Sequence, residues 1–212
     1  GGHGRELFDT LAACDDAARR GDAGPPWELL GFVDDDPGAT ERVARLGTQV
    51  LGPVSWLVEH PAAYALGIGD GAVRRRLSAE LDGAGCRPAT VVHPGAYLGR
   101  DVELAEGVVV YDRSTITTNV RIGRHSHLNV ACAVQHDSTV GDFVQFSPGV
   151  LVNGDCAIGD EVFLGTGAIV TRGCRVGARA RVGAGAVVLD DVAPGTPVVG
   201  VPARPVGGTA QP

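Results

Sequence analysis

The strongest constraint on this chain is a six-residue repeat that runs from Val92 to Val188. A helix repeats its apolar face every 3.6 residues and a strand every two, so a period of six fits neither. It is typical of a parallel β-helix, in which three six-residue segments make one triangular coil and residues 18 apart stack on adjacent coils. We expect the repeated side chains to fill the inside of the prism. These positions are Val92, Leu98, Leu104, Val110, Ile116, Ile122, Leu128, Val134, Val140, Phe146, Val152, Ile158, Leu164, Val170, Val176, Val182 and Val188.

Small residues or Val precede each repeated position by two, and we expect them to turn the corners of the prism. Val192 is assigned to this corner class. The 32 glycines follow the same period, which favours a solenoid over a disordered chain.

The charge balance limits the classes of partner. With 18 Lys and Arg against 25 Asp and Glu, the net charge is −7, which argues against a nucleic-acid or anionic-membrane partner. No apolar run reaches membrane-spanning length and no signal peptide is recognisable, so we expect a cytoplasmic protein without membrane insertion. The sequence opens on Gly1 without Met, as if its beginning had been trimmed.

Residues 1–90 have a different pattern, in which helical and strand-like segments alternate. Apolar residues at Leu7, Leu11, Cys14 and Ala18 predict a helix that Gly21 ends. Further expected elements are strands at Trp27–Val33, Val50–Leu51 and Ala63–Ile68, a short helix from Pro53 to Leu57, and a helix carrying Val73, Leu77 and Leu81. Alternation of this kind predicts a small, Rossmann-like parallel α/β domain.

Three polar or Gly-rich segments are expected at the carboxyl edge of that sheet, where α/β proteins bind ligands. Glycines at a helix N-terminus let backbone N–H groups approach an anion, and acidic residues suit a ribose or a base. The alternative is that the glycines form turns and the aspartates cap helices. The predicted nucleotide-binding residues are Gly2, His3, Gly4, Asp34, Asp35, Gly69 and Asp70.

The predicted domains are an α/β domain at 1–90, a β-helix at 91–192, and a C-terminal cap and tail at 193–212. We expect residues from Gly207 onward to be frayed.

His136 lies two residues past a repeated position, so it points out of the prism. A single outward His is usually a surface residue. Here Gly154, 18 residues later, leaves room for a ligand, and Asn129 offers a nearby amide. Asp137 could orient the imidazole, although adjacent residues of a strand normally face opposite sides.

A column of compact residues 18 apart predicts a groove for an extended ligand arm: Pro148, Thr166, Ala184 and Pro202. The alternative is a packed interface between subunits, and the two interpretations are compatible if the groove lies at that interface.

The sequence also contains residue types that could form a metal site or a disulfide. His125, His127 and His136 suggest zinc, but His127 and His136 lie on different hexads and no third ligand stands at a suitable spacing, so we expect no metal. Cys156 and Cys174 stack 18 apart and a disulfide is conceivable, but we favour free, buried thiols in a reducing compartment.

Several motifs together resemble one family, the sialic acid O-acetyltransferases, which include N-acetyltransferases of UDP- and GDP-linked 4-amino sugars of the bacillosamine and perosamine type. The motifs are Gly2–Glu6, Gly31–Pro37, Ile68–Asp70, His93–Pro94, Asn129, Gln135–Asp137, Ser147–Gly149 and Gly200–Ala203. The match covers nearly the whole chain, and its N-terminal motifs are its most specific part.

The resemblance implies a left-handed β-helix that forms a homotrimer, with acetyl-CoA between adjacent prisms and a nucleotide sugar on the α/β domain. His136 matches the catalytic base, with Asn129 and Asp137 as its neighbours. Gly154 matches a backbone amide that contacts the thioester carbonyl, and Thr166 and Ala184 match positions along the pantetheine arm. We expect the adenine end of acetyl-CoA to point toward Pro202.

The chain departs from the family pattern in two places. The apolar strand before the Gly-rich loop is absent, and Gln145 stands where the family commonly has a second His that contacts the acetyl donor. We therefore expect Gln145 in the donor site, with altered contacts.

The resemblance predicts acetyl-CoA-dependent N-acetylation of a nucleotide-linked amino sugar, by direct transfer with His136 as base. Alternatives are O-acetylation of a sugar such as sialic acid, a non-catalytic trimer, and a carbonic-anhydrase-like metal protein. For the trimer we expect flat outward faces that carry Phe143, Phe163 and Val144.

Overall fold

The computed structural model describes residues 2–20 and 27–206. The expectations about Gly1, about Gly21 as the end of the first helix, and about a frayed tail from Gly207 lie outside these residues. Within them, no helix combines the length and the apolar character needed to cross a bilayer.

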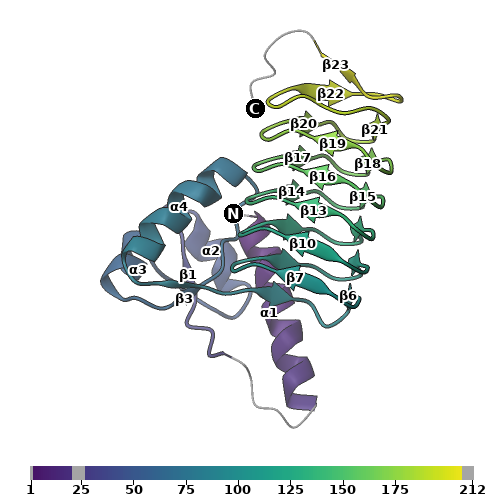
Figure 1. The fold of residues 1–212 in the computed structure, drawn as a ribbon. Helices are drawn as coiled ribbons and strands as arrows, with labels where there is room; N and C mark the ends of the chain where they lie inside the picture. The colour runs from purple at the N-terminus through teal and green to yellow at the C-terminus, as the bar shows by residue number, and fades with distance from the viewer. Residues whose placement is uncertain (1, 21–26, 207–212) are drawn as a thin grey trace.

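The chain from Val91 onward forms a left-handed parallel β-helix with three faces, as predicted (Figure 1). Its first face continues through residues 197–205, which were expected in an irregular cap after residue 192. The first face contains β5 (Val91–Val92), β8 (Val109–Val110), β11 (His127–Leu128), β14 (Gln145–Phe146), β17 (Phe163–Leu164), β20 (Arg181–Val182), β22 (Pro197–Val199) and β23 (Arg204–Pro205). The second contains β6 (Tyr97–Leu98), β9 (Thr115–Ile116), β12 (Ala133–Val134), β15 (Leu151–Val152), β18 (Ile169–Val170) and β21 (Val187–Val188). The third contains β7 (Val102–Leu104), β10 (Val120–Ile122), β13 (Thr139–Val140), β16 (Ala157–Ile158) and β19 (Arg175–Val176).

The register of the coils follows the sequence period. Leu128 pairs with Phe146 on the first face, and Val134 pairs with Val152 on the second. All four side chains are fully buried in one continuous core. Burying an aliphatic or Phe side chain stabilises a fold by about 1.5–3 kcal/mol, so the repeated positions hold the prism together.

The last coil departs from that register. Val192 pairs with Val176, and Val198 pairs with Val182, in each case 16 residues apart rather than 18. The segment from Val188 to the next inward position, Val192, is therefore two residues shorter than the usual six-residue repeat. The assignment of Val192 to the corner class is wrong, because it occupies an inward strand position and is 8% exposed.

The N-terminal part alternates short strands and helices. Its elements are α1 (Gly2–Arg20), β1 (Phe32–Val33), α2 (Ala39–Ala44), β2 (Val50–Gly52), α3 (Ser55–Glu59), β3 (Ala63–Tyr64), α4 (Gly71–Gly83) and β4 (Arg87–Pro88). The hydrogen-bonded ladders are two separate parallel pairs, β1–β2 and β3–β4.

Two strands, β1 and β3, are shorter than the sequence predicted, and α2 and β4 were not predicted at all. Leu29 and Leu30 are 42% and 48% exposed, so the apolar run that begins at Trp27 does not pack as a buried strand. After Tyr64 the chain packs on α1 instead of pairing with another described strand: a Cβ on Gly67 would lie 2.4 Å from Cα of Gly4.

The N-terminal elements lie against the first face and the corner between the third and first faces (Figure 1). Leu7 of α1 packs with Val91, Val109 and Tyr111. At the corner, Asp82 of α4 accepts hydrogen bonds from Tyr64 (2.7 Å) and Arg124 (3.0 Å).

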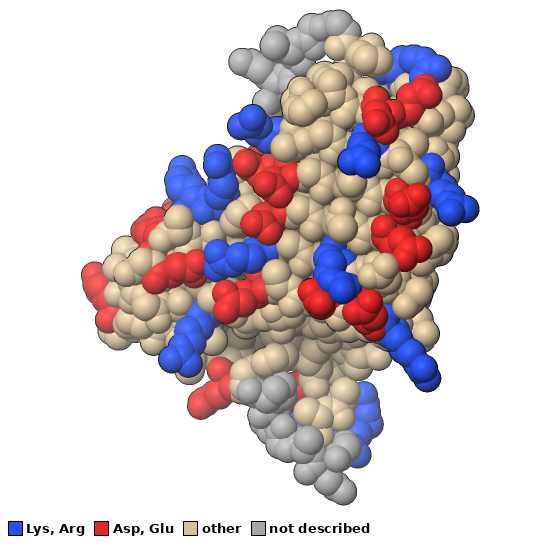
Figure 2. All heavy atoms as spheres, in the orientation of Figure 1, with Lys and Arg blue, Asp and Glu red and all other residues tan. Residues whose placement is uncertain are grey.

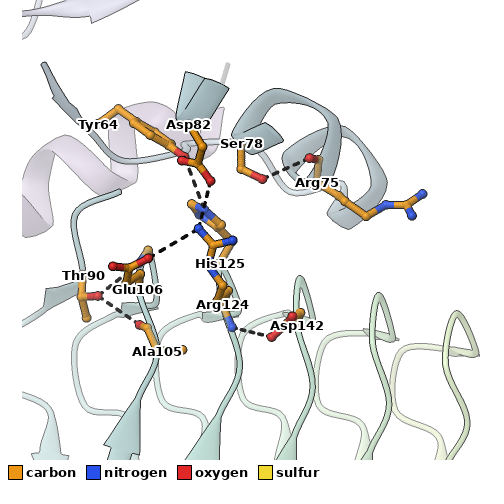
Figure 3. A network of polar contacts seen from close by, with 11 residues as sticks. Tyr64, Arg75, Ser78, Asp82, Thr90, Ala105, Glu106, Arg124, His125 and Asp142 are labelled. Carbon is orange, nitrogen blue, oxygen red and sulfur yellow. Dashed lines mark hydrogen bonds and ion pairs between the residues drawn. The ribbon is translucent and has the colours of Figure 1, made fainter. Parts of the chain in front are cut away.

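His125 lies beside this network and joins the two parts of the chain (Figure 3). Its ring is stacked between Tyr64 and Phe143, with ring centroids 5.9 Å and 5.5 Å away. Burial, followed by the positive charge of Arg124, lowers the pKa of His125 to about 4.

Candidate active site

His136 and Asp137 form a hydrogen-bonded pair at the corner between the second and third faces. Nδ1 of His136 lies 2.8 Å from Oδ2 of Asp137, and the two side chains are 44% and 54% exposed. The rule that neighbouring residues face opposite sides does not apply here, because Asp137 is in the left-handed region with φ 61°. That backbone conformation turns its carboxylate toward the preceding imidazole.

Asn119 holds the other oxygen of that carboxylate. Its Nδ2 donates to Oδ1 of Asp137 over 2.7 Å. The hydrogen bond from Asn119, followed by that with His136, keeps the pKa of Asp137 below its usual value.

Gly154 lies directly against the His136 ring. A Cβ on Gly154 would come within 2.6 Å of both Cε1 and Nε2. The space that Gly154 leaves is thus filled by the imidazole, whereas the sequence suggested that a ligand would fill it. Among the described residues, the Gly154 N–H donates to no carbonyl of the ladder.

The predicted groove residues lie at a different corner, between the first and second faces. Pro148, Thr166 and Ala184 are exposed there, and their coils stack through Gly167 N–H to Pro148 O (2.9 Å) and Gly185 N–H to Thr166 O (2.8 Å). Pro202 is exposed but leaves this column, since the register of the last coil is two residues short.

Asn129 belongs to the same corner as the groove and does not reach His136. It is 5% exposed, and its side-chain oxygen accepts from the N–H of Val130 over 2.7 Å. Within residues 2–20 and 27–206, no hydrogen bond joins it to His136 of the same chain. The whole second face separates the two side chains.

Gln145 does not lie in the exposed groove. It is 3% exposed, its Oε1 accepts from Nη1 of Arg74 over 2.9 Å, and its Nε2 donates to the carbonyl of Phe146 over 3.0 Å. Both the oxygen and the nitrogen of the side-chain amide are therefore engaged under the N-terminal elements, away from the groove in which Gln145 was expected.

Arg74 of α4 is fully buried and spans the N-terminal part and the β-helix. Besides Gln145, its guanidinium donates to the carbonyls of Ile68, Gly69, His125, Phe143 and Val144 over 2.7–3.1 Å. Burial lowers its pKa to about 10, so it stays charged at neutral pH.

The segments predicted to bind a nucleotide come together at the N-terminus of α1. The ring of His3 lies over Gly69, where a Cβ would be 3.1 Å from Cε1, and a Cβ on Gly4 would lie 3.5 Å from the Phe32 ring and 3.8 Å from the carbonyl of Gly67. Gly2 begins α1 and has open space at its Cα. These contacts bring the first turn of α1, the end of β1 and the 67–70 loop together.

The aspartates of this region also have structural roles. Asp70 caps α4 by accepting from the N–H of Val73 over 3.0 Å. Asp35 accepts from the N–H of Val54 over 2.9 Å, and Asp34 accepts from the N–H of Asp36 over 3.0 Å. The helix-cap alternative therefore holds for Asp70.

The three histidines considered for a metal do not share a site. His125 and His127 are fully buried, while His136 is half-exposed at another corner. In the part of the chain that the structure describes, no group of three or more His, Cys, Asp and Glu side chains could hold an ion.

Sequence reasoning missed Asn119 and Arg74. Asn119 could have been found, because it stands 18 residues before Asp137 and stacks on it. Nothing in the local sequence distinguishes Arg74 from its neighbours Arg75 and Arg76.

Comparisons with known proteins decide the family. Residues 155–190 match the family model described as bacterial transferase hexapeptide (six repeats). A variant of perosamine N-acetyltransferase from Caulobacter crescentus, solved with CoA and GDP-perosamine, is 30% identical with a TM-score of 0.85, over 98% of this chain and 94% of that chain. This chain belongs to the hexapeptide-repeat transferases. The predicted resemblance is thereby confirmed.

Two further relatives of this transferase support the same grouping. The acetyltransferase domain of PglB from Neisseria gonorrhoeae is 28% identical with a TM-score of 0.85, over 97% of this chain and 96% of that one. A GDP-perosamine N-acetyltransferase from Escherichia coli is 35% identical over 91 residues, which are 43% of this chain. That match spans 41% of the curated relative's length.

Proposed function

We propose that the protein transfers the acetyl group of acetyl-CoA to the amino group of a nucleotide-linked amino sugar, with GDP-perosamine as the first candidate acceptor. The observation that carries the proposal is the His136–Asp137 pair beside Gly154. The relatives named for perosamine N-acetylation, one of them solved with GDP-perosamine, direct the choice of acceptor.

The pair provides a base with a defined tautomer. The Asp137 carboxylate accepts a hydrogen bond from the Nδ1–H of His136, which leaves Nε2 unprotonated. Nε2 removes a proton from the acceptor amine as its nitrogen bonds to the thioester carbon. The Gly154 N–H, which donates to no carbonyl of the described ladder, donates to the oxygen that becomes negative. The carbon–sulfur bond then breaks, and the thiolate of CoA takes the proton from His136.

The site needs a second copy of the chain. The base lies at the corner between the second and third faces, and the groove of Pro148, Thr166 and Ala184 lies at the corner between the first and second. In a closed trimer, the corner that carries the base in one protomer can meet the corner that carries the groove in its neighbour. We place acetyl-CoA between them, with Asn129 and the groove from one protomer and His136 from the next.

The second face has the composition of a subunit interface. Its outward residues are Tyr97, Thr115, Ala133, Leu151, Ile169 and Val187. None carries a charge, and Tyr97 and Leu151 are 61% and 40% exposed. The third face instead bears Glu103, Arg121 and Arg175, and Figure 2 shows acidic and basic side chains interspersed on the side turned to the viewer.

This assignment corrects the faces expected from sequence. Val144 is inside the core, Phe143 is 9% exposed beside His125, and Phe163 is covered by the guanidinium of Arg181 at 4.7 Å. The interface we propose is therefore the second face, since its burial between subunits would remove no charged side chain from water.

We assign the nucleotide to the N-terminal elements, where His3, Gly4 and Gly69 meet. Gly2 and Asp34 flank this point from α1 and from the end of β1. Five free thiols support a reducing compartment, for which we propose the cytoplasm.

A thiol-release assay with acetyl-CoA tests the proposal. GDP-perosamine and UDP- and dTDP-linked 4-amino sugars serve as acceptors, and the matching 4-hydroxy sugars and free sialic acid serve as controls. We expect release of CoA and a monoacetylated product only with an amino sugar. Turnover with a hydroxyl acceptor only would establish the O-acetyltransferase instead, and no turnover with any acceptor would refute the proposal.

A further inference from the structure

We propose that Asn119 is a positioning residue for the transfer reaction, acting on His136 through Asp137. The inference rests on the proposed function, in which His136 is the base. Asn119 Nδ2 to Asp137 Oδ1 (2.7 Å) and Asp137 Oδ2 to His136 Nδ1 (2.8 Å) make a continuous chain of hydrogen bonds along one corner of the β-helix.

The backbone explains why these side chains meet. Asn119 and Asp137 occupy equivalent corners of successive coils, and both are left-handed, with φ 55° and 61°. Asn tolerates this region better than most residues. Two identical corners on adjacent coils project their side chains in parallel, which brings the amide of one to the carboxylate of the other.

The amide of Asn119 gives the two carboxylate oxygens of Asp137 different partners. With Oδ1 held by Asn119, Oδ2 is directed at Nδ1 of His136. The hydrogen bond from Asn119 is also the largest cause of the lowered pKa of Asp137. An ionised, oriented Asp137 fixes the proton of His136 on Nδ1 and keeps Nε2 ready to accept one.

Other charged groups surround Asp137 and stay unchanged in the test. Arg172 lowers its pKa further, and Asp155 and Arg175 line the same surface hollow. Neither Arg172 nor Arg175 donates a described hydrogen bond to the Asp137 side chain, so the amide of Asn119 is the neutral donor that sets its orientation.

Two variants separate positioning from corner stability. Asn119→Gly removes the amide and keeps the left-handed backbone accessible. Asn119→Asp keeps the shape and places a second carboxylate against Asp137. Arg179→Gly is the control, because Arg179 is an exposed left-handed corner residue with φ 60° and no described side-chain partner.

The primary readout does not require activity. With ¹⁵N-labelled His, the ring of His136 in the parent should show a protonated Nδ1 and an unprotonated Nε2. In Asn119→Gly the two nitrogens should move toward averaged signals, and the ¹³C titration midpoint of the Asp137 carboxyl should rise. Asn119→Asp should raise that midpoint further, because like charges disfavour ionisation.

The kinetic readout tests the consequence for transfer. In both variants kcat should fall roughly tenfold or more, as for a mispositioned catalytic group, while KM for acetyl-CoA stays at the parent value. Arg179→Gly should match the parent in every measurement.

Unchanged His136 signals, Asp137 titration and kcat in Asn119→Asp, which is the variant least able to disturb the fold, would overturn the inference. If the parent itself transfers no acetyl group, the proposed function fails, and the nitrogen and carboxyl signals still decide whether Asn119 positions the pair.

Discussion

Nδ1 of His136 lies 2.8 Å from Oδ2 of Asp137, the next residue in the chain. Adjacent residues reach each other in this way only because Asp137 is left-handed. The same corner geometry repeats along the β-helix, so a general feature of the fold has produced an oriented imidazole at one position.

Gly154→Ala should impair the reaction by moving this imidazole. The added methyl would lie 2.6 Å from Nε2 and Cε1 of His136, so the ring must turn away from its place beside Asp137. We expect turnover to fall by roughly 100-fold, the effect of misplacing a catalytic group by about 1 Å, with little change in melting temperature. Gly83→Ala is the control, since a Cβ there meets no atom within 4 Å. Parent-like turnover in Gly154→Ala would show that the ring need not lie over this glycine.

Leu151→Arg should dissociate the proposed trimer. It introduces a charge at the centre of the uncharged second face, where Leu151 is 40% exposed in the single chain. Sedimentation should show monomers, and acetyl transfer should be lost with them because each site is shared. Val58→Arg on α3 is matched in exposure at 39% and should leave the assembly intact. A trimer that survives Leu151→Arg would exclude the second face as the interface.

Arg74→Met should destabilise the fold much more than Arg75→Met. Removing Arg74 takes away a donor from five buried or partly buried carbonyls and from the side-chain oxygen of Gln145, which should cost about 3 kcal/mol. Arg75 is 59% exposed, and among the described residues its side chain pairs only with Glu161 at 3.5 Å, so its loss should cost less than about 1 kcal/mol. Urea unfolding of both variants measures the difference, and equal midpoints would contradict the proposed role of Arg74.

His125 should make the protein sensitive to mild acid. Its pKa is about 4 in the folded chain and 6.5 in the unfolded one, so the unfolded chain binds the extra proton as the pH falls. Stability should therefore decline between about pH 6.5 and pH 4. His125→Asn keeps a residue that tolerates φ 51° and removes the titrating group. Its melting temperature should depend less on pH across this window, and parallel slopes for parent and variant would refute the prediction.

The sequence period was enough to predict the β-helix, since each coil repeats one packing solution for Leu, Ile and Val. It could not predict the two-residue slip at Val192, because Val suits both a corner and an inward position. The N-terminal strands were harder for a different reason. Leu29 and Leu30 are apolar without being buried, so hydrophobicity overstated the length of β1.

The candidate site was predictable to the extent that the period of 18 specifies neighbours. It correctly stacked Gly154 on His136, and it would have identified Asn119 if applied in the other direction. Closeness along the chain was a poor guide, because residues about one hexad apart lie at different corners of the prism. Asn129 and His136 are close in sequence and lie at different corners, and the buried Gln145 is fixed by Arg74, which is 71 residues away in the chain.

The most direct test of the shared site is complementation between two inactive variants. His136→Asn removes the base from one corner, and Ala184→Trp blocks the groove at the other; each homotrimer should lose nearly all activity, and His136→Asn should still bind CoA. In trimers assembled at random from equal amounts of both, one interface in four joins an intact base to an intact groove. We therefore expect about a quarter of the parent rate. Mixed trimers as inactive as the two separate variants would contradict a site built from His136 of one protomer and the groove of the next.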